Sequence, residues 1–246
     1  MLFKLFVFFQ ALSLLPLVLA TQPGTKPVYL SNQALAIENS PPDFGNHFAV
    51  LNLDLIDAIV ANVNTTDEGK KWINNTARWI DAVHKQNPAL LNVFTRIYFS
   101  TSQRPEVGPD TPFASVVEGL GNLTESSAKS HIYTAFKTED DDVVVPKTRY
   151  YAGAGNSIEE ILNSQKIETV ILSGIRTSGV VLATALRLFD LDYNVYVISN
   201  NTIEPGPTGE KIQHSILYDI FPKVPVKVIT IEEALAGLKT SGSSVV

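Results

Sequence analysis

ETVILSGIRTSGVV, residues 168–181, is the stretch that decides the fold of this chain. Residues 168–173 form a short, almost continuous apolar run with β-branched side chains, which is typical of a strand buried on both faces. Residues 174–179 begin and end with glycine, which marks a turn. Residues 178–189 follow with an Ala- and Leu-rich pattern that predicts a helix. A buried strand that passes through a tight turn into a helix is the repeating unit of a parallel α/β sheet.

The same alternation of apolar strands and helical patterns recurs along the chain. Strands are expected at 47–54, 91–99, 142–146, 168–173, 194–198 and 226–230, and helices at 66–86, 157–165, 178–189, 209–221 and 231–238. Ser157 and Glu160 match the capping-box pattern at the start of one of these helices. Nearly continuous apolar strands separated by helices argue for a parallel sheet covered on both faces. We therefore predict a single doubly wound α/β domain, with a six-stranded, mainly parallel sheet between two layers of helices.

The first 20 residues read as a secretory signal peptide. Lys4 gives a basic start, residues 2–19 are nearly all apolar, and Val18-Leu19-Ala20 is a small-residue cleavage site. A membrane anchor is the alternative, but polar residues and a proline interrupt the apolar run, which is marginal against the ~20 residues that span a bilayer. We expect a signal peptide at 1–20, an N-terminal extension at 21–46 and the α/β domain at 47–240. The mature protein is then secreted and leaves the membrane.

The composition agrees with export. Four Asn-x-Ser/Thr sequons predict N-glycosylation on exposed loops or helix faces, at Asn64, Asn74, Asn122 and Asn200. The chain has no cysteine, and a domain of this size needs no disulfide. Its net charge is −6 and it has no basic run, which argues against nucleic acid and anionic membrane surfaces as partners.

Three positions at strand ends are candidates for one site. Asp54 ends the first strand, Lys147 follows the third, and the turn 174–179 follows the fourth. Ligands of doubly wound sheets bind beyond the carboxyl ends of the strands, where the strand order reverses, so these positions should converge there. Taken singly, Asp54 reads as a carboxylate that caps a turn and Lys147 as a solvated loop lysine. Their placement beside the turn favours a functional pair, and we predict both as catalytic residues.

Three segments resemble the isochorismatase-like hydrolase superfamily, and the resemblance covers about residues 48–238. Residues 49–54 (AVLNLD) are similar to that family's first strand with its aspartate, and residues 145–152 (VPKTRYYA) to its lysine segment. Residues 167–181 resemble the segment that carries the catalytic cysteine, with Val180 at the position of that cysteine. The chain is therefore identified as a member of a branch that lacks the nucleophile, and amidase chemistry of the nicotinamidase kind is not expected.

The resemblance also implies details of the site. A cis peptide is expected between Ile175 and Arg176, with the amides of Arg176 and Val180 placed as an oxyanion hole. Tyr150, Arg176, Thr177 and Val180 are expected to contact the substrate, and Arg176 either binds a carboxylate or fills the pocket. The metal ligands of nicotinamidases are missing, so neither a metal nor a cofactor is expected. Relatives often assemble as dimers or tetramers, which implies a homo-oligomer.

Three functional hypotheses follow. The first is hydrolysis of an isochorismate-like vinyl ether, a small carboxylate-bearing metabolite, with Asp54 as general acid beside Lys147. Burial raises the pKa of a carboxyl and a neighbouring lysine lowers it, and the sequence does not decide between the two effects. The second hypothesis is a catalytically inactive protein that binds a small acid. The third is a protein-binding role in which the long loop 100–130 acts as a lid or as a contact between subunits.

Overall fold

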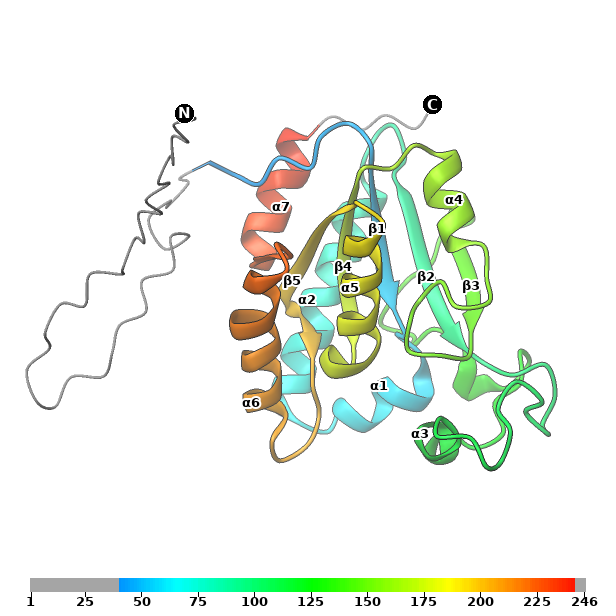
Figure 1. Cartoon of the computed structure of the whole chain (residues 1–246). Helices are drawn as coiled ribbons and strands as arrows, with labels where there is room; N and C mark the ends of the chain where they lie inside the picture. Colours follow the sequence, from blue (N-terminus) through cyan, green and yellow to red (C-terminus); the bar gives the residue numbers. More distant parts are fainter. Residues whose placement is uncertain (1–39, 242–246) are drawn as a thin grey trace, which may run out of the picture. The chain divides into compact units, whose positions relative to one another are not determined.

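A computed structural model describes residues 40–241 of the chain. The predicted signal peptide at 1–20, and the part of the predicted extension up to residue 39, lie outside the described residues. Six strands form one sheet in the order β3-β2-β1-β4-β5-β6, and every neighbouring pair is parallel (Figure 1). The strands are β1 (Phe48–Leu53), β2 (Leu91–Ile97), β3 (Val143–Lys147), β4 (Thr169–Ile175), β5 (Asn194–Ile203) and β6 (Lys227–Ile229). The prediction of a doubly wound α/β fold is confirmed.

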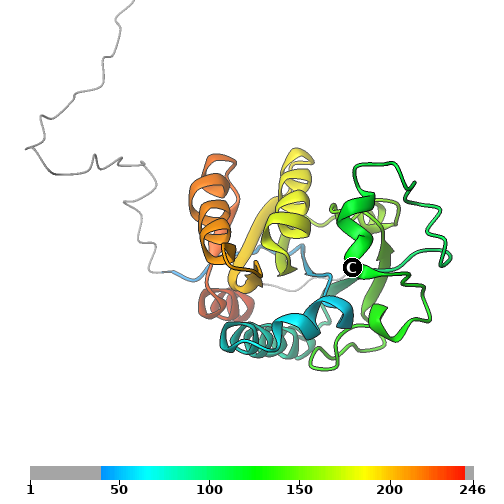
Figure 2. The same ribbon diagram turned by 90° about the horizontal axis from the view of Figure 1, so that it is seen from below.

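Helices cover both faces of this sheet. They are α1 (Asp57–Val63), α2 (Asp67–His84), α3 (Ala114–Val117), α4 (Ile158–Ser164), α5 (Leu182–Asp190), α6 (Gly209–His214) and α7 (Ile231–Thr240). Side chains of α2 and α7 pack on one face, and those of α4, α5 and the π-helical continuation of α6 (Ser215–Ile220) pack on the other. The view along the strands in Figure 2 shows the two layers on either side of the sheet.

The central strands are buried because they lie between these layers. All six residues of β1 and all seven of β4 are buried, as expected for parallel strands covered on both sides. The strand order reverses between β1 and β4, because β1 pairs with β2 on one side and with β4 on the other. The carboxyl ends of these two strands therefore open the crevice in which ligands of such sheets bind.

Several helix boundaries depend on capping. The Thr66 side chain accepts a hydrogen bond from the Gly69 amide at the start of α2. The capping box predicted for Ser157 is wrong, since its side chain makes no cap hydrogen bond and Asn156 Oδ1 accepts the Ile158 amide instead. A capping box is present at Thr230, which starts α7. The short helix α1 was missed by the sequence pattern.

Within residues 40–241, no helix is both long and apolar enough to cross a membrane.

Candidate active site

Asp54 and Lys147 form a buried ion pair at the carboxyl edge of the sheet. Lys147 Nζ lies 2.8 Å from Asp54 Oδ2, and both side chains are at most 5% exposed. The Asp54 backbone turns out of β1 in the left-handed region (φ 59°), which directs the strand end into the crevice. Thr95 of β2 fixes the carboxyl group, because its hydroxyl donates to Asp54 Oδ1 over 2.7 Å and accepts from the Asp54 amide over 2.9 Å. The two predicted residues are therefore in direct contact.

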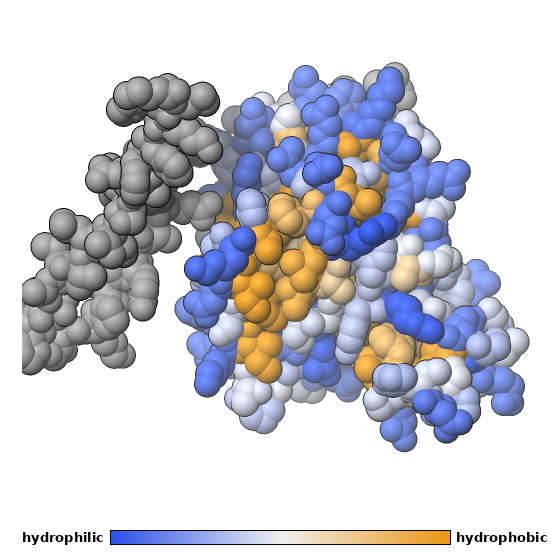
Figure 3. Space-filling model, viewed as in Figure 1, coloured by the Kyte–Doolittle hydropathy of each residue, from blue (hydrophilic) through white to orange (hydrophobic). Residues whose placement is uncertain are grey.

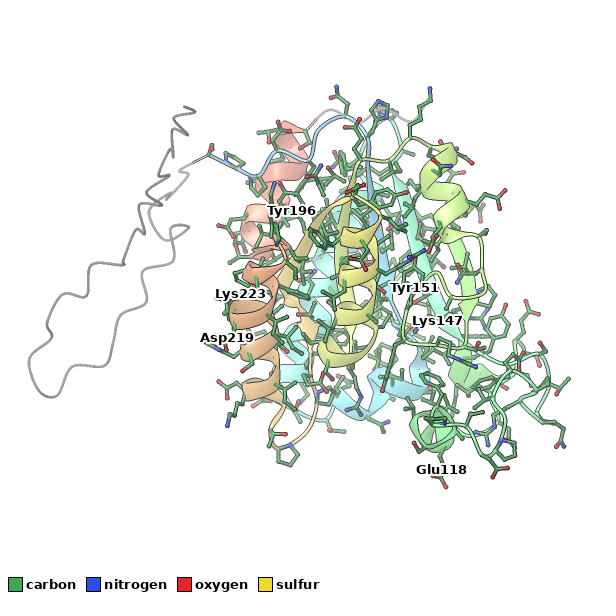
Figure 4. All side chains as sticks on the ribbon, in the orientation of Figure 1. Glu118, Lys147, Tyr151, Tyr196, Asp219 and Lys223 are labelled. Carbon is green, nitrogen blue, oxygen red and sulfur yellow. The ribbon has the colours of Figure 1, made fainter. Side chains whose placement is uncertain are left out.

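The Lys147 ammonium group is fully engaged within the protein. Besides Asp54, it donates to the carbonyl oxygens of Arg149 over 2.6 Å and Tyr150 over 3.2 Å. An ammonium group has three N–H donors, so these contacts use all of them. Lys147 lies at the end of β3 (Figure 4), where the loop that follows supplies both carbonyls. The lysine therefore orients Asp54 and has no donor left for a substrate.

Burial raises the pKa of Asp54 above its ordinary value. The ammonium of Lys147 and the hydrogen bonds from Lys147 and Thr95 act in the opposite direction, but the loss of solvent around the carboxyl is the largest effect. The two opposing effects that the sequence left open are thus resolved in favour of burial. A carboxyl of this kind holds its proton at a higher pH than a solvated aspartic acid and can serve as a general acid.

The turn after β4 forms the next wall of the site. The peptide bond between Ile175 and Arg176 is cis, at the position that the family resemblance implied. Gly174 lies in a conformation that favours glycine (φ 147°), and a Cβ there would stand 2.3 Å from the Leu53 carbonyl oxygen of β1. A π-helical turn, Thr177–Val181, then leads into α5. Val180 in this turn is 1% exposed, and its side chain has no lone pair for nucleophilic attack.

These groups border a cavity of about 430 Å³. Asp54, Lys147, Tyr150, Arg176 and Val180 all contribute to its lining. The rest of the wall comes mainly from α1, from the segment around α3 and from the loop after β5; these residues include Ile59, Asn62, Phe113, Val117, Leu120 and Glu204. Part of the loop 100–130 thus forms one side of the cavity, and its role as a lid or as a contact between subunits stays a prediction.

Thr177 is the predicted contact residue that the structure places elsewhere. It is fully buried, is not among the residues that line the cavity, and its hydroxyl donates to Gln213 Oε1 over 3.4 Å. Gln213 Oε1 also accepts the Glu204 amide, and its amide group donates to the Thr202 carbonyl. Thr177 therefore ties the turn to the end of β5 rather than facing a ligand.

Glu204 is a cavity residue that the sequence reasoning missed. Its side chain is 5% exposed, accepts the Ser178 amide at Oε2 over 2.7 Å and lies 3.5 Å from Arg176 Nη1 through Oε1. Glu204 follows β5, which extends to Ile203, five residues beyond the predicted end of that strand. A prediction that extended this strand to residue 203 would have placed Glu204 at the same edge of the sheet as Asp54. The length of β5 was therefore the feature that could have identified Glu204.

Arg176 is the cation of the cavity that remains open to a ligand. Its side chain is 55% exposed, and its one ion pair within residues 40–241 is the long contact with Glu204. Arg149, by contrast, donates to the carbonyls of Thr148 and Glu106 and stacks over the Phe113 ring. In the described part of the chain, no three His, Asp or Glu side chains lie close enough together to hold a metal ion.

The sequons lie outside this cavity lining. Asn64, Asn74 and Asn122 are exposed, at the end of α1, on α2 and in the loop between β2 and β3. Asn200 is half-buried in β5, where its side-chain oxygen accepts the Ile231 amide at the start of α7. Three of the four predicted sites are thus exposed, although the Asn64 amide group donates to the Tyr133 hydroxyl over 2.8 Å, and the fourth has its carboxamide oxygen engaged.

The acid–lysine pair, the cis peptide and the cavity at the switch point of the sheet define a doubly wound α/β protein with a small-molecule site. Residues 48–233 match the isochorismatase domain, and the chain belongs to the isochorismatase family, whose members are generally hydrolases.

Two relatives of known sequence differ in whether their names describe an active enzyme. The chain is 23% identical over 219 residues to the ureidoacrylate amidohydrolase RutB of Variovorax paradoxus, covering 83% of this chain and 81% of the relative. It is 24% identical over 177 residues to a protein of Arabidopsis thaliana named as a probable inactive nicotinamidase, covering 72% of this chain and 83% of the relative.

Solved structures agree on the fold. An isochorismatase family protein from Burkholderia thailandensis superimposes with a TM-score of 0.68 at 25% identity, covering 82% of this chain and all of the other. The N-carbamoylsarcosine amidase of Thermoplasma acidophilum superimposes with a TM-score of 0.60 at 17% identity, covering 76% of this chain and 97% of the other.

Proposed function

We propose that this protein is a hydrolase that cleaves an isochorismate-like vinyl ether without a cysteine nucleophile. The observation that carries the proposal is the buried Asp54 carboxyl, which lines the cavity and has a raised pKa. Vinyl ethers are cleaved by protonation of carbon, a step that needs an acid and no nucleophilic side chain. Val180 at the position of the family's cysteine is compatible with this chemistry and excludes a thiol ester intermediate.

The reaction proceeds in two stages. The Asp54 carboxyl gives its proton to the terminal methylene carbon of the enol ether, which leaves an oxocarbenium ion. Water adds to the oxocarbenium carbon, the resulting hemiketal loses the ring alcohol, and pyruvate is released. Lys147 stabilises the carboxylate that Asp54 becomes and holds its orientation, since its other donors are tied to backbone carbonyls. Arg176 binds a carboxylate of the substrate at the open side of the cavity.

The test is the release of pyruvate from isochorismate, followed by a coupled assay with lactate dehydrogenase. We expect Asp54→Asn to abolish release, because the amide has no proton of suitable acidity to give. The matched control is Asp57→Asn on the neighbouring helix α1, a residue outside the cavity lining, which should retain activity. Full activity of folded Asp54→Asn protein would exclude the proposed acid.

An inactive binding protein is the second candidate, favoured by Val180 and by the similarity to a probable inactive nicotinamidase. In that case the cavity holds a small carboxylic acid through Arg176 and no bond is broken. A panel of small carboxylic acids should then raise the melting temperature of the wild type and not of Arg176→Ala, with no product detected by mass spectrometry. Turnover of any compound in the panel decides against this candidate.

We also propose that the protein is secreted and glycosylated. The sequence supports this through residues 1–20, and the exposed positions of Asn64, Asn74 and Asn122 are compatible with it. Expression of the full chain in a eukaryotic host should yield protein in the medium that begins near Thr21. Treatment with peptide N-glycosidase should lower its mass, and replacing the three exposed asparagines with glutamine should remove that shift. Protein that stays in the cell with Met1 attached contradicts the proposal.

A further inference from the structure

Glu204 places a buried carboxylate group beside Arg176 in the wall of the cavity. Both residues line the cavity, and Glu204 Oε1 lies 3.5 Å from Arg176 Nη1. The Glu204 side chain is 5% exposed, whereas that of Arg176 is 55% exposed. A hydrogen-bond acceptor and a set of donors, of opposite charge, therefore lie together at one point of the wall.

The two carboxylate oxygens of Glu204 differ in what they contact. Oε2 accepts the Ser178 amide over 2.7 Å, which fixes the carboxylate against the turn after β4. Within residues 40–241, Oε1 accepts no hydrogen bond, and its contact with Arg176 is longer than a hydrogen bond between ionised groups. An oxygen of a buried carboxylate that lacks a donor costs free energy, so a donor on a ligand would stabilise the complex here.

The backbone around Glu204 holds this carboxylate in place. The Glu204 amide donates to Gln213 Oε1 over 2.9 Å, and Pro205 restricts the backbone of the residue before it. Gly209, at the start of α6, packs so closely that a Cβ there would overlap the Glu204 carbonyl oxygen. A side chain that is already fixed loses little conformational freedom when a ligand binds, so Oε1 is a preorganised acceptor.

Arg176 supplies the complementary donors. A guanidinium group has five N–H donors in a planar fork that matches a carboxylate. In the part of the chain that the structure describes, the polar contact of this side chain is the long ion pair with Glu204, so the fork is free to bind a ligand. Because that contact spans only 3.5 Å, a ligand that engages both side chains has its own donor one or two carbon atoms from its carboxylate. Hydroxyl and ammonium groups are donors of this kind.

Much of the remaining cavity wall is apolar and fits an apolar body on the same ligand. The side chains that form it come from α1 and from the segment around α3, and they are Ile59, Val63, Phe113, Val117 and Leu120. Figure 3 shows hydrophobic side chains near the place that α3 has in Figure 1. Contact with these side chains removes apolar ligand surface from water, which favours a ring or an alkyl chain over a fully polar acid.

We propose that Arg176 and Glu204 form a subsite for α- or β-hydroxy or amino acids that carry an apolar body. Arg176 binds the ligand carboxylate through paired hydrogen bonds, and Glu204 Oε1 accepts the neighbouring hydroxyl or ammonium group. An acid without that donor brings a second carboxylate beside Glu204 and leaves Oε1 unpaired, so it binds less tightly.

This subsite rests on the proposed function, because it takes the cavity as the substrate site. Isochorismate carries a ring hydroxyl on the carbon next to the carboxylated carbon, and its isomer chorismate does not. The subsite therefore makes Glu204 the residue that distinguishes these two vinyl ethers.

The test uses three ring acids that contain no vinyl ether, so that binding is measured apart from turnover. They are cyclohexanecarboxylate and the cis and trans isomers of 2-hydroxycyclohexanecarboxylate and 2-aminocyclohexanecarboxylate. Each is titrated into the full chain by isothermal titration calorimetry. We expect the hydroxy acid, the amino acid or both to bind the wild type at least about tenfold more tightly than the unsubstituted acid. The donor that gives the larger gain identifies the ligand class.

Two variants separate the roles of the pair. Glu204→Gln removes the free acceptor, because its amide oxygen keeps the Ser178 hydrogen bond and its NH2 group takes the place of Oε1. This variant should bind all three acids with affinities within about threefold of one another. Arg176→Ala should weaken the binding of every acid by at least about tenfold. The matched control is Glu210→Gln, an exposed residue of α6 outside the cavity lining, which should keep the wild-type preference.

The wild-type titrations decide the matter even where a variant does not fold. A wild type that binds the three acids equally, or binds none of them, overturns the subsite, and so does a folded Glu204→Gln protein that keeps the preference. Pyruvate release from isochorismate is measured separately. Its absence in a protein that shows the preference refutes the proposed hydrolysis and leaves the subsite in place. Its presence in a protein without the preference supports the hydrolysis and refutes the subsite.

Discussion

Removing Lys147 should make the stability of the protein depend steeply on pH. In Lys147→Met, Asp54 stays buried and keeps its hydrogen bond from Thr95, but it loses the ammonium group 2.8 Å away. Burial already raises the pKa of Asp54 in the presence of that lysine, so its removal raises the pKa further. The Arg149 and Tyr150 carbonyls lose their donor as well, which adds a loss of ~1–3 kcal/mol that does not depend on pH.

The size of the effect follows from proton linkage. An unfolded aspartic acid has a pKa of ~3.9, and one pKa unit corresponds to ~1.4 kcal/mol. A raised pKa in the folded state stabilises the fold fully below the unfolded value, and this contribution is lost as the pH rises towards the folded value. While folded Asp54 stays protonated, the free energy of unfolding of Lys147→Met therefore falls by ~1.4 kcal/mol per pH unit. For each pH unit over which folded Asp54 keeps its proton, Lys147→Met therefore loses ~1.4 kcal/mol relative to the double variant Asp54→Asn with Lys147→Met, which has no carboxyl at position 54.

Urea unfolding at pH 5, 6, 7 and 8 checks this prediction, with the fluorescence of Trp72 and Trp79, both buried on α2, as the signal. The reference is the double variant Asp54→Asn with Lys147→Met, which has no titrating carboxyl at position 54 and should lack the additional slope. If Lys147→Met and this double variant differ by the same free energy at all four pH values, Asp54 is not held protonated by burial and the reasoning fails.

Four further predictions concern the turn, the cavity and the helix caps. Gly174→Ala should destabilise the fold by more than ~1 kcal/mol in urea unfolding, because the new Cβ meets the Leu53 carbonyl oxygen in a backbone conformation that favours glycine. Val180→Cys places a thiol against the cavity in a chain that has no other cysteine. Mass spectrometry after iodoacetamide treatment should therefore find one adduct on the variant, at position 180, and none on the wild type. Thr230→Ala should lower the free energy of unfolding by ~1 kcal/mol, because it removes a capping box. Ser157→Ala should change it by less than ~0.5 kcal/mol, because that side chain makes no cap bond.

The fold could be predicted from the sequence because its strands are buried on both faces. Nearly continuous apolar runs separated by helical patterns admit few arrangements other than a covered parallel sheet. Local contacts, such as helix caps and strand ends, were harder to predict from the sequence. Ser157 and Thr230 are both followed by glutamate three residues later, yet of these two only Thr230 forms the box. Thr230 has the extended backbone of a helix N-cap (ψ 165°), whereas Ser157 does not (ψ 12°). The end of β5 was placed too early because Ser199, Asn200 and Asn201 are polar, although the strand continues through them.

The site was predicted to the extent that strand ends define it. Asp54 and Lys147 meet because β1 and β3 end at the same edge of one sheet, which the element order implies. The hydrogen-bond partners in the site could not be predicted from the sequence. The two carbonyl oxygens that accept from Lys147 belong to an irregular loop, and the position of Glu204 depends on the length of β5. The direction of the Asp54 pKa also required the structure, because it depends on how far burial exceeds a nearby charge.

The internal contacts of Lys147 bear on the choice between the two candidate functions. A cation whose three donors are bound to Asp54 and to two backbone carbonyls contributes little to holding a ligand. A buried ion pair is also weak evidence of stabilisation, since the desolvation of both charges opposes their attraction. The Asp54–Lys147 pair therefore favours the catalytic candidate, in which Asp54 exchanges a proton with the substrate and Lys147 stabilises the resulting carboxylate. A binding protein needs Arg176 and the shape of the cavity but not this pair, so Asp54→Asn should leave ligand affinity unchanged in a binder and remove turnover in a hydrolase.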